Sequence, residues 1–272
     1  MFILYYNDFI MADIILFRGA VHPYYKSPYY VPPWGLLYVA SLPYHDTDFT
    51  IKIIDEELHK DWQTVMRDEL TDKTICVGVS SITGHQIHSG LTFSRFVKNR
   101  VDVPVVWGCA HPTILPEGTL EHPLVDIVVK GEGEYVFYNL VCALARGEAL
   151  SHIDSLGYKD SSRIIMNKEC DYLTMNDLPD IPLSLIDVED YINRVHPACT
   201  YTERGFELHI SRGCNHGCSF CYNNKGKWRG YSAERVIDQV EKLRAAYHID
   251  GLHWREDNFL WIEKESLTYA RL

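Results

Sequence analysis

Five short apolar runs alternate with helix-like segments over the first half of the chain, and this alternation constrains the fold most strongly. Each run is mostly aliphatic and shows no alternation of polar and apolar positions, which is typical of strands buried on both faces of a parallel sheet. The runs are residues 13–17, 51–54, 75–79, 104–107 and 126–129. Apolar residues recur at helical spacing in segments 34–42, 62–70, 87–97 and 135–145. The pattern predicts an α/β domain with a flavodoxin-like (Rossmann-like) open sheet.

Three turns of this predicted sheet are candidate binding elements, because ligands of such sheets bind beyond the carboxyl ends of the strands. Each turn places glycine or a small hydroxyl residue where a bulky planar ligand could approach the backbone. The turns are residues 80–84, 108–112 and 130–134. A glycine after a strand is more often only a turn residue, so one such turn alone is weak evidence for a ligand.

A cysteine-rich loop is the second strong feature. Three of the eight cysteines lie within eight residues, and an aromatic residue directly precedes the last; the four positions are Cys214, Cys218, Phe220 and Cys221. Three thiolates on one loop can hold three corners of a [4Fe-4S] cluster, whose fourth iron then lacks a protein ligand. A zinc site completed by His216 or His209 is the alternative, although zinc sites normally use paired C-x-x-C spacing.

Composition and charge limit the classes of partner. A chain of 272 residues with 46% hydrophobic and 23% charged residues has globular composition. The net charge of −11 argues against nucleic acid, since proteins that bind it concentrate lysine and arginine. No apolar run approaches the roughly 18–20 residues of a membrane span, and the first ten residues lack the basic region of a signal peptide. The sequence therefore predicts neither a nucleic-acid nor a membrane partner.

The remaining five cysteines are scattered singly along the chain. They are Cys76, Cys109, Cys142, Cys170 and Cys199. Scattered cysteines in apolar surroundings are typical of small buried side chains in a reducing compartment, and they make a disulfide framework the weaker interpretation. A cytoplasmic location follows as the prediction.

Changes in composition predict three parts: residues 1–147, 148–200 and 201–272. Aspartates are interspersed in the middle part, where residues 156–158 and 163–166 could pair as a small hairpin, and the prolines near 180 favour an extended linker. In the last part, a strand at 207–211 would lead directly into the cysteine loop. Ser232 is a good N-cap for a following helix, and a second strand begins at Gly251.

The cysteine loop resembles that of the radical S-adenosylmethionine (SAM) superfamily, whose C-x3-C-x-aromatic-C pattern it matches. The first domain resembles the cobalamin-binding domain that precedes the catalytic domain in one large radical SAM subfamily. Four of its recurring motifs stand in order at 32–36 (PPWGL), 78–81 (GVSS), 108–111 (GCAH) and 131–134 (GEGE). Cys109 replaces the second glycine of the third motif.

This resemblance implies a flavodoxin-like cobalamin-binding domain followed by the start of a radical SAM partial TIM barrel. It implies three cofactors: a [4Fe-4S] cluster, SAM and cobalamin. The implied activity is reductive cleavage of SAM to a deoxyadenosyl radical, used for methyl transfer to an unactivated carbon or a related radical reaction. The partners would be a small-molecule substrate and an external electron donor such as flavodoxin or ferredoxin.

The resemblance also implies the site residues. The cluster ligands would be Cys214, Cys218 and Cys221. SAM would be contacted by Phe220, Glu256, Asp257 and Asn258, and cobalamin by Ser80, Ser81, Thr83, Gly108, His111, Gly131, Glu132 and Gly133. The alternatives that involve no ligand are a core aromatic at Phe220 and a helix-entry turn at 256–258.

The Asp-x-His-x-x-Gly pattern of other cobalamin enzymes is absent after the first strand, so we expect cobalamin without a protein imidazole on cobalt, His22 being the candidate that could overturn this. Residues 201–272 hold about two of the six strand–helix units of a complete barrel, since one unit takes roughly 30 residues. The alternatives are therefore a catalytically incomplete module that binds cobalamin and an iron–sulfur cluster, or a zinc-stabilised α/β protein. The substrate cannot be predicted.

Overall fold

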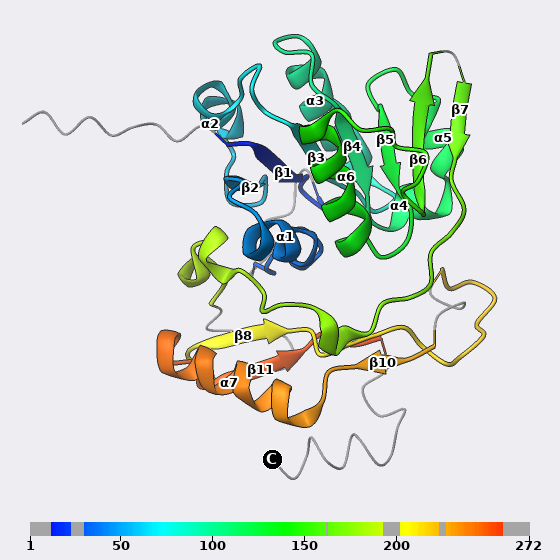
Figure 1. Ribbon diagram of the computed structural model, residues 1–272. Coiled ribbons are helices and arrows are strands. Elements are labelled where there is room, and N and C mark those ends of the chain that lie inside the picture. Colours follow the sequence, from blue (N-terminus) through cyan, green and yellow to red (C-terminus); the bar gives the residue numbers. More distant parts are fainter. Residues whose placement is uncertain (1–11, 23–29, 162, 193–201, 223–226, 258–272) are drawn as a thin grey trace, which may run out of the picture. The chain divides into compact units, whose positions relative to one another are not determined.

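The computed structural model describes residues 12–22, 30–161, 163–192, 202–222 and 227–257 (Figure 1). Its contacts divide the chain into two compact units. Unit 1 comprises the described residues up to Val21 together with Pro43–Glu169, and unit 2 comprises those of His22–Leu42 and Cys170–Leu272. The domain boundaries at 147/148 and 200/201 stay a prediction.

Unit 1 is built on a seven-stranded sheet of order β2-β1-β3-β4-β5-β6-β7 (Figure 1). The first five strands are parallel, and the order 2-1-3-4-5 is that of flavodoxin-like sheets. Their bounds are β1 Ile14–Arg18, β2 Ile51–Asp55, β3 Cys76–Ser80, β4 Val105–Gly108 and β5 Ile127–Val129. All five predicted strands and the predicted fold class are confirmed, with boundaries shifted by about one residue.

The predicted hairpin also forms, but it belongs to this sheet. Strand β6 (Leu156–Asp160) pairs antiparallel with β5, and β7 (Arg163–Met166) pairs antiparallel with β6. Gly157 makes this close packing possible, because a Cβ there would lie 2.5 Å from Sδ of Met166 and 2.9 Å from Cδ1 of Leu120. The hairpin therefore closes one edge of the unit 1 sheet.

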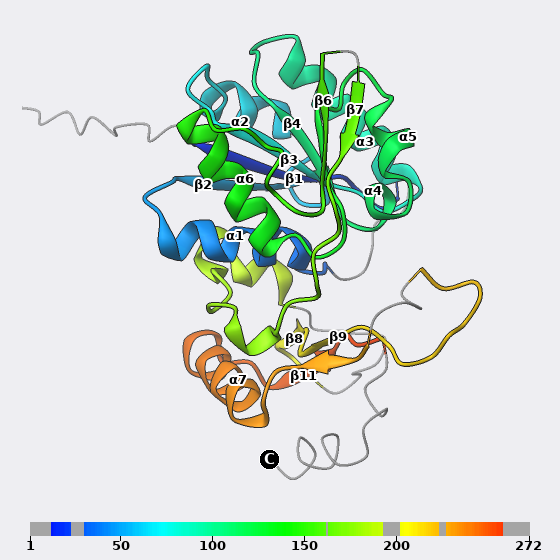
Figure 2. The same ribbon diagram turned by 45° about the vertical axis from the view of Figure 1, so that its right-hand side comes forward.

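Helices cover both faces of the unit 1 sheet, with α2 and α3 on one face and α6 on the other (Figures 1 and 2). The bounds are α1 Trp34–Asp46, α2 Trp62–Glu69, α3 His85–Lys98 and α6 Glu134–Arg146, which confirm the four predicted helices. Two further helices, α4 (Ala110–Ile114) and α5 (Pro116–Leu120), were not predicted. Five residues make little more than one turn, so they show no helical periodicity in the sequence.

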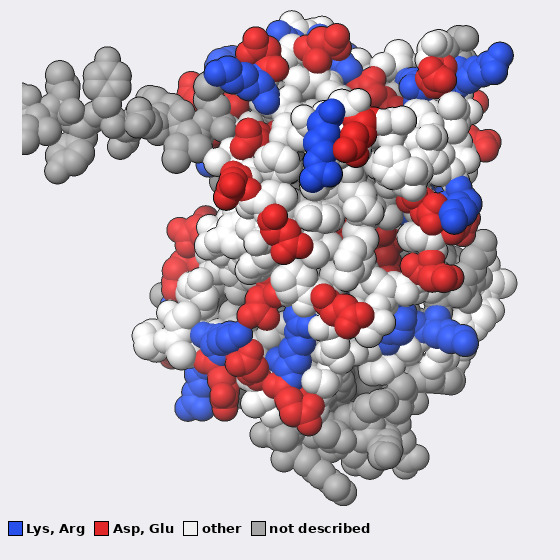
Figure 3. Space-filling model, in the orientation of Figure 1, with Lys and Arg blue, Asp and Glu red and all other residues white. Residues whose placement is uncertain are grey.

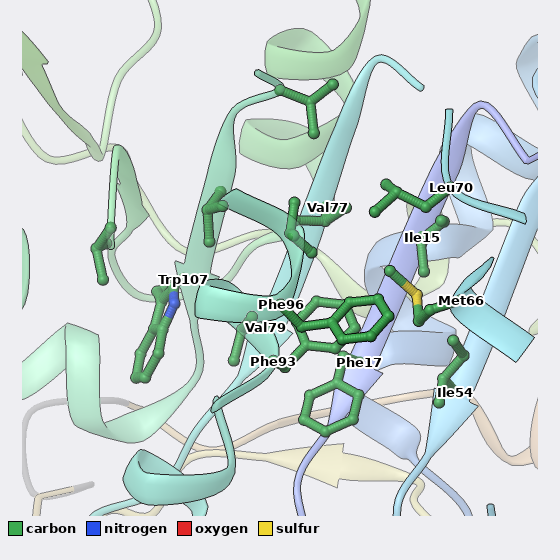
Figure 4. Packing of buried hydrophobic residues seen from close by; sticks show 14 of the residues in the cluster. Ile15, Phe17, Ile54, Met66, Leu70, Val77, Val79, Phe93, Phe96 and Trp107 are labelled. Atoms are coloured by element: carbon green, nitrogen blue, oxygen red, sulfur yellow. The ribbon is translucent and has the colours of Figure 1, made fainter. Parts of the chain in front are cut away.

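An aromatic cluster forms the core between the sheet and α2 and α3 (Figure 4). The ring of Phe17 stacks on that of Phe93 with 4.2 Å between centroids, and Trp62 contacts both rings. Gly90 lets α3 approach the sheet, because a Cβ there would lie 2.8 Å from Val79. This packing fixes the ends of the central strands, where the candidate ligand turns begin.

Unit 2 contains a βαβ unit, in which β8 (Gly205–Leu208) and β11 (Gly251–Trp254) pair in parallel and α7 (Ala233–Tyr247) connects them. The first strand begins two residues earlier than predicted. Its predicted final residue, Ser211, instead belongs to β9 (Ser211–Arg212), which pairs antiparallel with β10 (Arg229–Gly230). The predicted cap is confirmed, since Oγ of Ser232 accepts a hydrogen bond from the Arg235 amide at 3.3 Å.

Arg235 holds the segment that precedes β8 onto α7. Its guanidinium group donates hydrogen bonds to the carbonyl oxygens of Asn176 (2.8 Å), Leu178 (2.6 Å) and Pro179 (3.0 Å). It also lies 4.4 Å from the centre of the Tyr231 ring. The predicted extended path at residues 178–182 lies between 3-10 turns at Met175–Asp177 and Leu183–Leu185, and a third such turn follows at Val188–Tyr191.

No helix in the part of the chain that the structure describes is long and apolar enough to cross a membrane. On the face drawn in Figure 3, basic and acidic side chains are interspersed.

Substitution of Arg235 by lysine is expected to destabilise unit 2. A lysine ammonium is a point donor and cannot satisfy three carbonyl oxygens that a planar guanidinium reaches together. One of these hydrogen bonds is exposed and two are part-buried, so we expect a total loss of about 1–3 kcal/mol. Denaturant unfolding will measure the loss, and limited proteolysis will show faster cleavage near residues 175–182. Arg244→Lys, at an exposed position of α7, is the matched control and should behave as wild type; equal cleavage rates in both variants would contradict the prediction.

Candidate functional site

The carboxyl ends of β3 and β4 bring two of the predicted ligand turns together. Ser80 lies opposite Gly108 in the parallel ladder. Beyond it, the amide of Ser81 donates to the carbonyl of Gly108 (3.1 Å), and the amide of His111 donates to the carbonyl of Ser81 (3.0 Å). These backbone bonds make residues 80–81 and 108–111 one continuous surface.

Side chains tie the remaining turn to this surface. Oγ1 of Thr83 lies 3.1 Å from Nδ1 of His111, and Oγ1 of Thr113 accepts a hydrogen bond from the Gly131 amide at 3.0 Å. Burial lowers the pKa of His111, so its imidazole is neutral at pH 7 and carries one donor and one acceptor nitrogen. The third predicted turn therefore meets the other two at the same edge.

Gly131 and its neighbours open α6. Gly131 has φ +81°, a left-handed conformation that favours glycine. Gly133 is the residue before the first turn of the helix, and Glu132 between them is half-buried. The structure thus brings together all eight residues predicted for this site, although their contact with a ligand stays a prediction.

Sequence reasoning missed two side chains that hold these turns. Thr113 is one of them. Gln86 is the other: its Nε2 donates to the Gly19 carbonyl at 2.8 Å and its Oε1 accepts from the Ile82 amide at 3.0 Å. Polar residues inside helices are common, and nothing in the sequence marks these two as turn acceptors.

Apolar side chains are exposed beside the same turns. Five large ones lie after the carboxyl ends of β1, β3, β4 and β5: Val21 (51% exposed), Ile82 (40%), Ile114 (50%), Leu115 (54%) and Tyr135 (43%). Gathered exposed apolar residues mark a binding surface more often than singly scattered ones. This edge of the sheet therefore combines glycine-lined backbone with apolar side chains, as a large flat ligand requires.

Cys109 is strained at this edge. It has φ 80° and ψ −163°, a conformation that glycine adopts freely and other residues rarely do. Its thiol is exposed. The strain follows directly from the presence of cysteine at the second position of the 108–111 turn.

Replacement of Cys109 by glycine is therefore expected to stabilise unit 1 by about 1 kcal/mol, the relieved strain minus the greater entropy of unfolded glycine. Thermal unfolding will detect this as a higher Tm. Cys170→Gly, at an exposed position without positive φ, is the control and should not raise the Tm. A lower Tm for the Cys109 variant would show that the turn is not strained.

The cysteine loop begins at a tight backbone approach. Gly213 has φ +79°, and a Cβ there would lie 2.4 Å from the carbonyl oxygen of Lys227. Across the same gap, Oδ1 of Asn215 accepts a hydrogen bond from the Trp228 amide at 3.0 Å. The paired strands β9 and β10 frame the loop at this point. Only glycine fits at position 213, and this close approach marks the beginning of the loop.

The three loop cysteines occupy different depths. Cys214 and Cys221 are half-buried and Cys218 is exposed, and the Cys221 amide donates to the Cys218 carbonyl at 3.1 Å. Among the described residues, no three His, Cys, Asp or Glu side chains converge on a point that could hold a metal ion. The ligand set therefore stays a prediction, supported by the donor chemistry of three thiolates on one short loop.

Two alternatives for individual residues can be compared with the structure. Phe220 is 91% exposed, so its interpretation as a core aromatic is wrong. His209 packs its ring against Trp34, with 5.7 Å between centroids, and burial lowers the pKa of His209 to about 3. His22 is exposed, and its relation to cobalt stays a prediction.

Glu256 lies at the exit of β11. Its Oε1 accepts hydrogen bonds from the amides of Ile210 (2.6 Å) and Ser211 (3.3 Å), and its Oε2 accepts from the Ser211 hydroxyl. Burial raises the pKa of Glu256 to about 7, although these hydrogen bonds act in the opposite direction; nearby Asp257 adds to the rise. Asp257 is exposed, and Asn258 lies outside the described residues. The SAM contacts predicted here stay predictions.

Glu256→Gln is expected to change how stability depends on pH. Because the pKa of Glu256 is raised to about 7, the folded chain binds more protons than the unfolded chain above the ordinary value of 4.5. This difference in proton binding adds to the free energy of unfolding. The added amount is fully present below pH 4.5 and is lost as the pH rises through about 7. Denaturant unfolding should show wild type losing stability relative to the variant across this window. The exposed control Glu241→Gln should show no such trend, and a flat difference for Glu256→Gln would refute the assignment.

The part of the chain that contains the three ligand turns was compared with known protein families. Residues 25–141 match the family model described as the B12 binding domain. This part of the chain is similar to B12-binding domains. The match contains all eight residues at the carboxyl edge of the unit 1 sheet, from Ser80 to Gly133.

Relatives extend the likeness beyond this domain. The chain is 33% identical over 251 residues to an uncharacterized methyltransferase of Pyrococcus horikoshii, covering 88% of this chain and 51% of the relative. It is 22% identical over 241 residues to an anaerobic magnesium-protoporphyrin IX monomethyl ester cyclase of Synechocystis sp., covering 84% and 46%. The chain thus spans about half the length of these curated relatives.

A solved structure shows the same fold. The cobalamin-dependent S-adenosylmethionine radical enzyme OxsB matches 97% of this chain and 37% of its own, with a TM-score of 0.74 at 18% identity. The predicted combination of a flavodoxin-like B12-binding domain with the start of a radical SAM barrel is confirmed, and so is the resemblance to B12-binding-domain radical SAM proteins.

Proposed function

We propose that this chain is the cofactor-bearing part of a cobalamin-dependent radical SAM enzyme that acts on a small molecule by methyl transfer to carbon or a related radical reaction. The observation that carries the proposal is the joining of two elements in one chain. One is the B12-binding domain with its continuous edge of turns, and the other is a C-x3-C-x-aromatic-C loop that follows the first strand of a parallel βαβ unit.

The cysteine loop fits a [4Fe-4S] cluster by its donor set. Cys214, Cys218 and Cys221 would hold three irons, and Gly213 allows the two ends of the loop to approach each other closely. When bound, such a cluster supplies the electron that splits the sulfonium bond of SAM, and methylcobalamin supplies the methyl group. An external donor such as flavodoxin or ferredoxin would supply electrons.

The residues around the loop would orient SAM. The exposed ring of Phe220 offers a flat apolar surface for the adenine. Asp257, with Asn258 beside it in the sequence, offers acceptors for the cationic ammonium group.

The edge of unit 1 would bind cobalamin through backbone and small side chains. Gly108 and Gly131 let the ligand approach the main chain, and the neutral ring of His111, fixed by Thr83, offers a hydrogen-bond partner. The exposed apolar side chains beside these turns would be covered by the ligand. The enzyme would work in the cytoplasm.

The kind of radical reaction is left open by the relatives. One is named a methyltransferase and another a cyclase, and these names describe those proteins. We favour methyl transfer because the methyltransferase is the more similar in sequence. The alternative is a binding module that holds both cofactors without turnover.

The test is anaerobic reconstitution of the 272-residue chain with iron, sulfide and hydroxocobalamin, then reduction with SAM present. The expected result is formation of 5′-deoxyadenosine. Alanine at Cys214, Cys218 and Cys221 should abolish it and remove the iron, whereas Cys142→Ala, on α6, is the matched control and should retain both. Iron retained after the triple substitution would refute the cluster site, and bound cofactors without SAM cleavage would favour the binding module.

The B12-binding surface is tested separately by His111→Ala. The variant loses the hydrogen-bonding ring between Thr83 and the ligand edge, so cobalamin affinity should fall by up to about tenfold, the value of one hydrogen bond. The optical spectrum of bound cobalamin gives the affinity by titration. His88→Ala, exposed on α3, is the control, and equal affinities in both variants would contradict the assigned surface.

A further inference from the structure

Glu256 joins two elements that the sequence keeps far apart. It follows the last residue of β11, while its hydrogen-bond donors Ile210 and Ser211 follow the end of β8. Ser211 stands three residues before the first cluster cysteine, Cys214. The carboxylate therefore connects the exit of one strand to the entrance of the cysteine loop.

The backbone at this entrance changes partners. Up to Leu208 the chain pairs with β11, and the last bond of that ladder is from the Arg255 amide to the Leu208 carbonyl at 3.0 Å. From Ser211 onward it pairs with β10 in the other sense, beginning with the bond from the Tyr231 amide to the Ile210 carbonyl at 2.9 Å. Backbone amides at such a change need acceptors from elsewhere. The carboxylate of Glu256 is the acceptor for the amides of both Ile210 and Ser211.

In its ionised form a carboxylate suits this task, because it accepts hydrogen bonds without donating any. Its two oxygens offer about four lone-pair sites, and three are used by Ile210 and Ser211. The group is half-buried, so these bonds compete little with water. Glutamine would keep one amide-accepting oxygen, and alanine would keep none.

Arg212 and Gly213, the next two residues of the entrance, make contacts of their own. The guanidinium group of Arg212 lies 4.3 Å from the centre of the Tyr38 ring, and Gly213 approaches the Lys227 carbonyl too closely for any side chain. Contacts of Glu256, Arg212 and Gly213 thus involve the four successive positions 210–213 ahead of Cys214. Of these, only Glu256 acts from the opposite strand.

We propose that Glu256 is a positioning residue of the cluster site, whose carboxylate fixes the exit of β8 so that the three cysteines are presented together, and that Glu256 does not itself contact SAM. This inference rests on the proposed function and refines it. It assigns adjacent carboxylates to different tasks: Glu256 acts inside the protein and the exposed Asp257 acts on the ligand.

The experiment compares Glu256→Ala, Glu256→Gln, Asp257→Asn and the exposed control Glu241→Gln in the reconstituted chain, before any SAM is added. The readouts are iron and sulfide per chain, the rate of iron loss to a chelator, and the low-temperature paramagnetic spectrum of the reduced cluster. SAM affinity is then measured on the same samples. Thermal unfolding of each apo variant identifies any that fail to fold.

Glu256→Ala is expected to lose iron about 10–100-fold faster than wild type, the usual effect of removing a group that supports metal ligands, and to show an altered spectrum without SAM. Glu256→Gln should recover part of the loss because it keeps one acceptor, and this partial rescue is not expected from a nonspecific loss of stability. Asp257→Asn should leave the SAM-free spectrum and iron loss unchanged while SAM affinity falls. Glu241→Gln should match wild type in all readouts.

Two results would overturn the inference. If Glu256→Ala and Glu256→Gln keep wild-type iron loss and spectrum but bind SAM weakly, Glu256 contacts SAM directly. If both variants match wild type throughout, Glu256 has no part in the site. Failure of the wild-type chain to take up iron and sulfide would instead refute the proposed function, so the two failures are distinguishable.

Discussion

Backbone amides beyond the ends of parallel strands need acceptors, and both units depend on side chains that supply them. In unit 1, Gln86 accepts from the Ile82 amide and Thr113 accepts from the Gly131 amide. In unit 2, Glu256 accepts from the amides of Ile210 and Ser211. The carboxyl ends of parallel strands meet at one edge of a sheet. Backbone groups without a partner in the sheet are therefore concentrated at that edge, where ligands of such sheets bind. The same bonds that complete the fold therefore shape the candidate sites.

This arrangement explains how turns that are each weak evidence for a ligand together form one defined surface. No glycine or serine in the three unit 1 turns is informative alone. Once β3 and β4 are paired, Ser81, Gly108 and His111 are linked by two backbone hydrogen bonds, and the remaining turn is tied to them through Thr113. The B12-binding domain match spans residues 25–141 and so contains all three turns, while their contact with the ligand stays a prediction.

The fold was largely predictable, and the site was predictable in part. Aliphatic runs predicted the five central strands because burial on both faces leaves a continuous apolar signature. The attachment of the 156–166 hairpin to β5 was not predictable, since any free edge offers the same backbone groups. The hydrogen bonds of Glu256 were not predictable for a related reason: they depend on which distant backbone comes near, and the local sequence carries no record of it.

The contact between Ser211 and Glu256 has an evolutionary consequence. Both the backbone and the hydroxyl of Ser211 donate to the same carboxylate. A replacement at one position leaves the buried Ser211 or the half-buried Glu256 without its partner, which is costly. Selection should therefore act on the pair, and among related chains that keep the cysteine spacing these two positions should covary, even though 45 residues separate them.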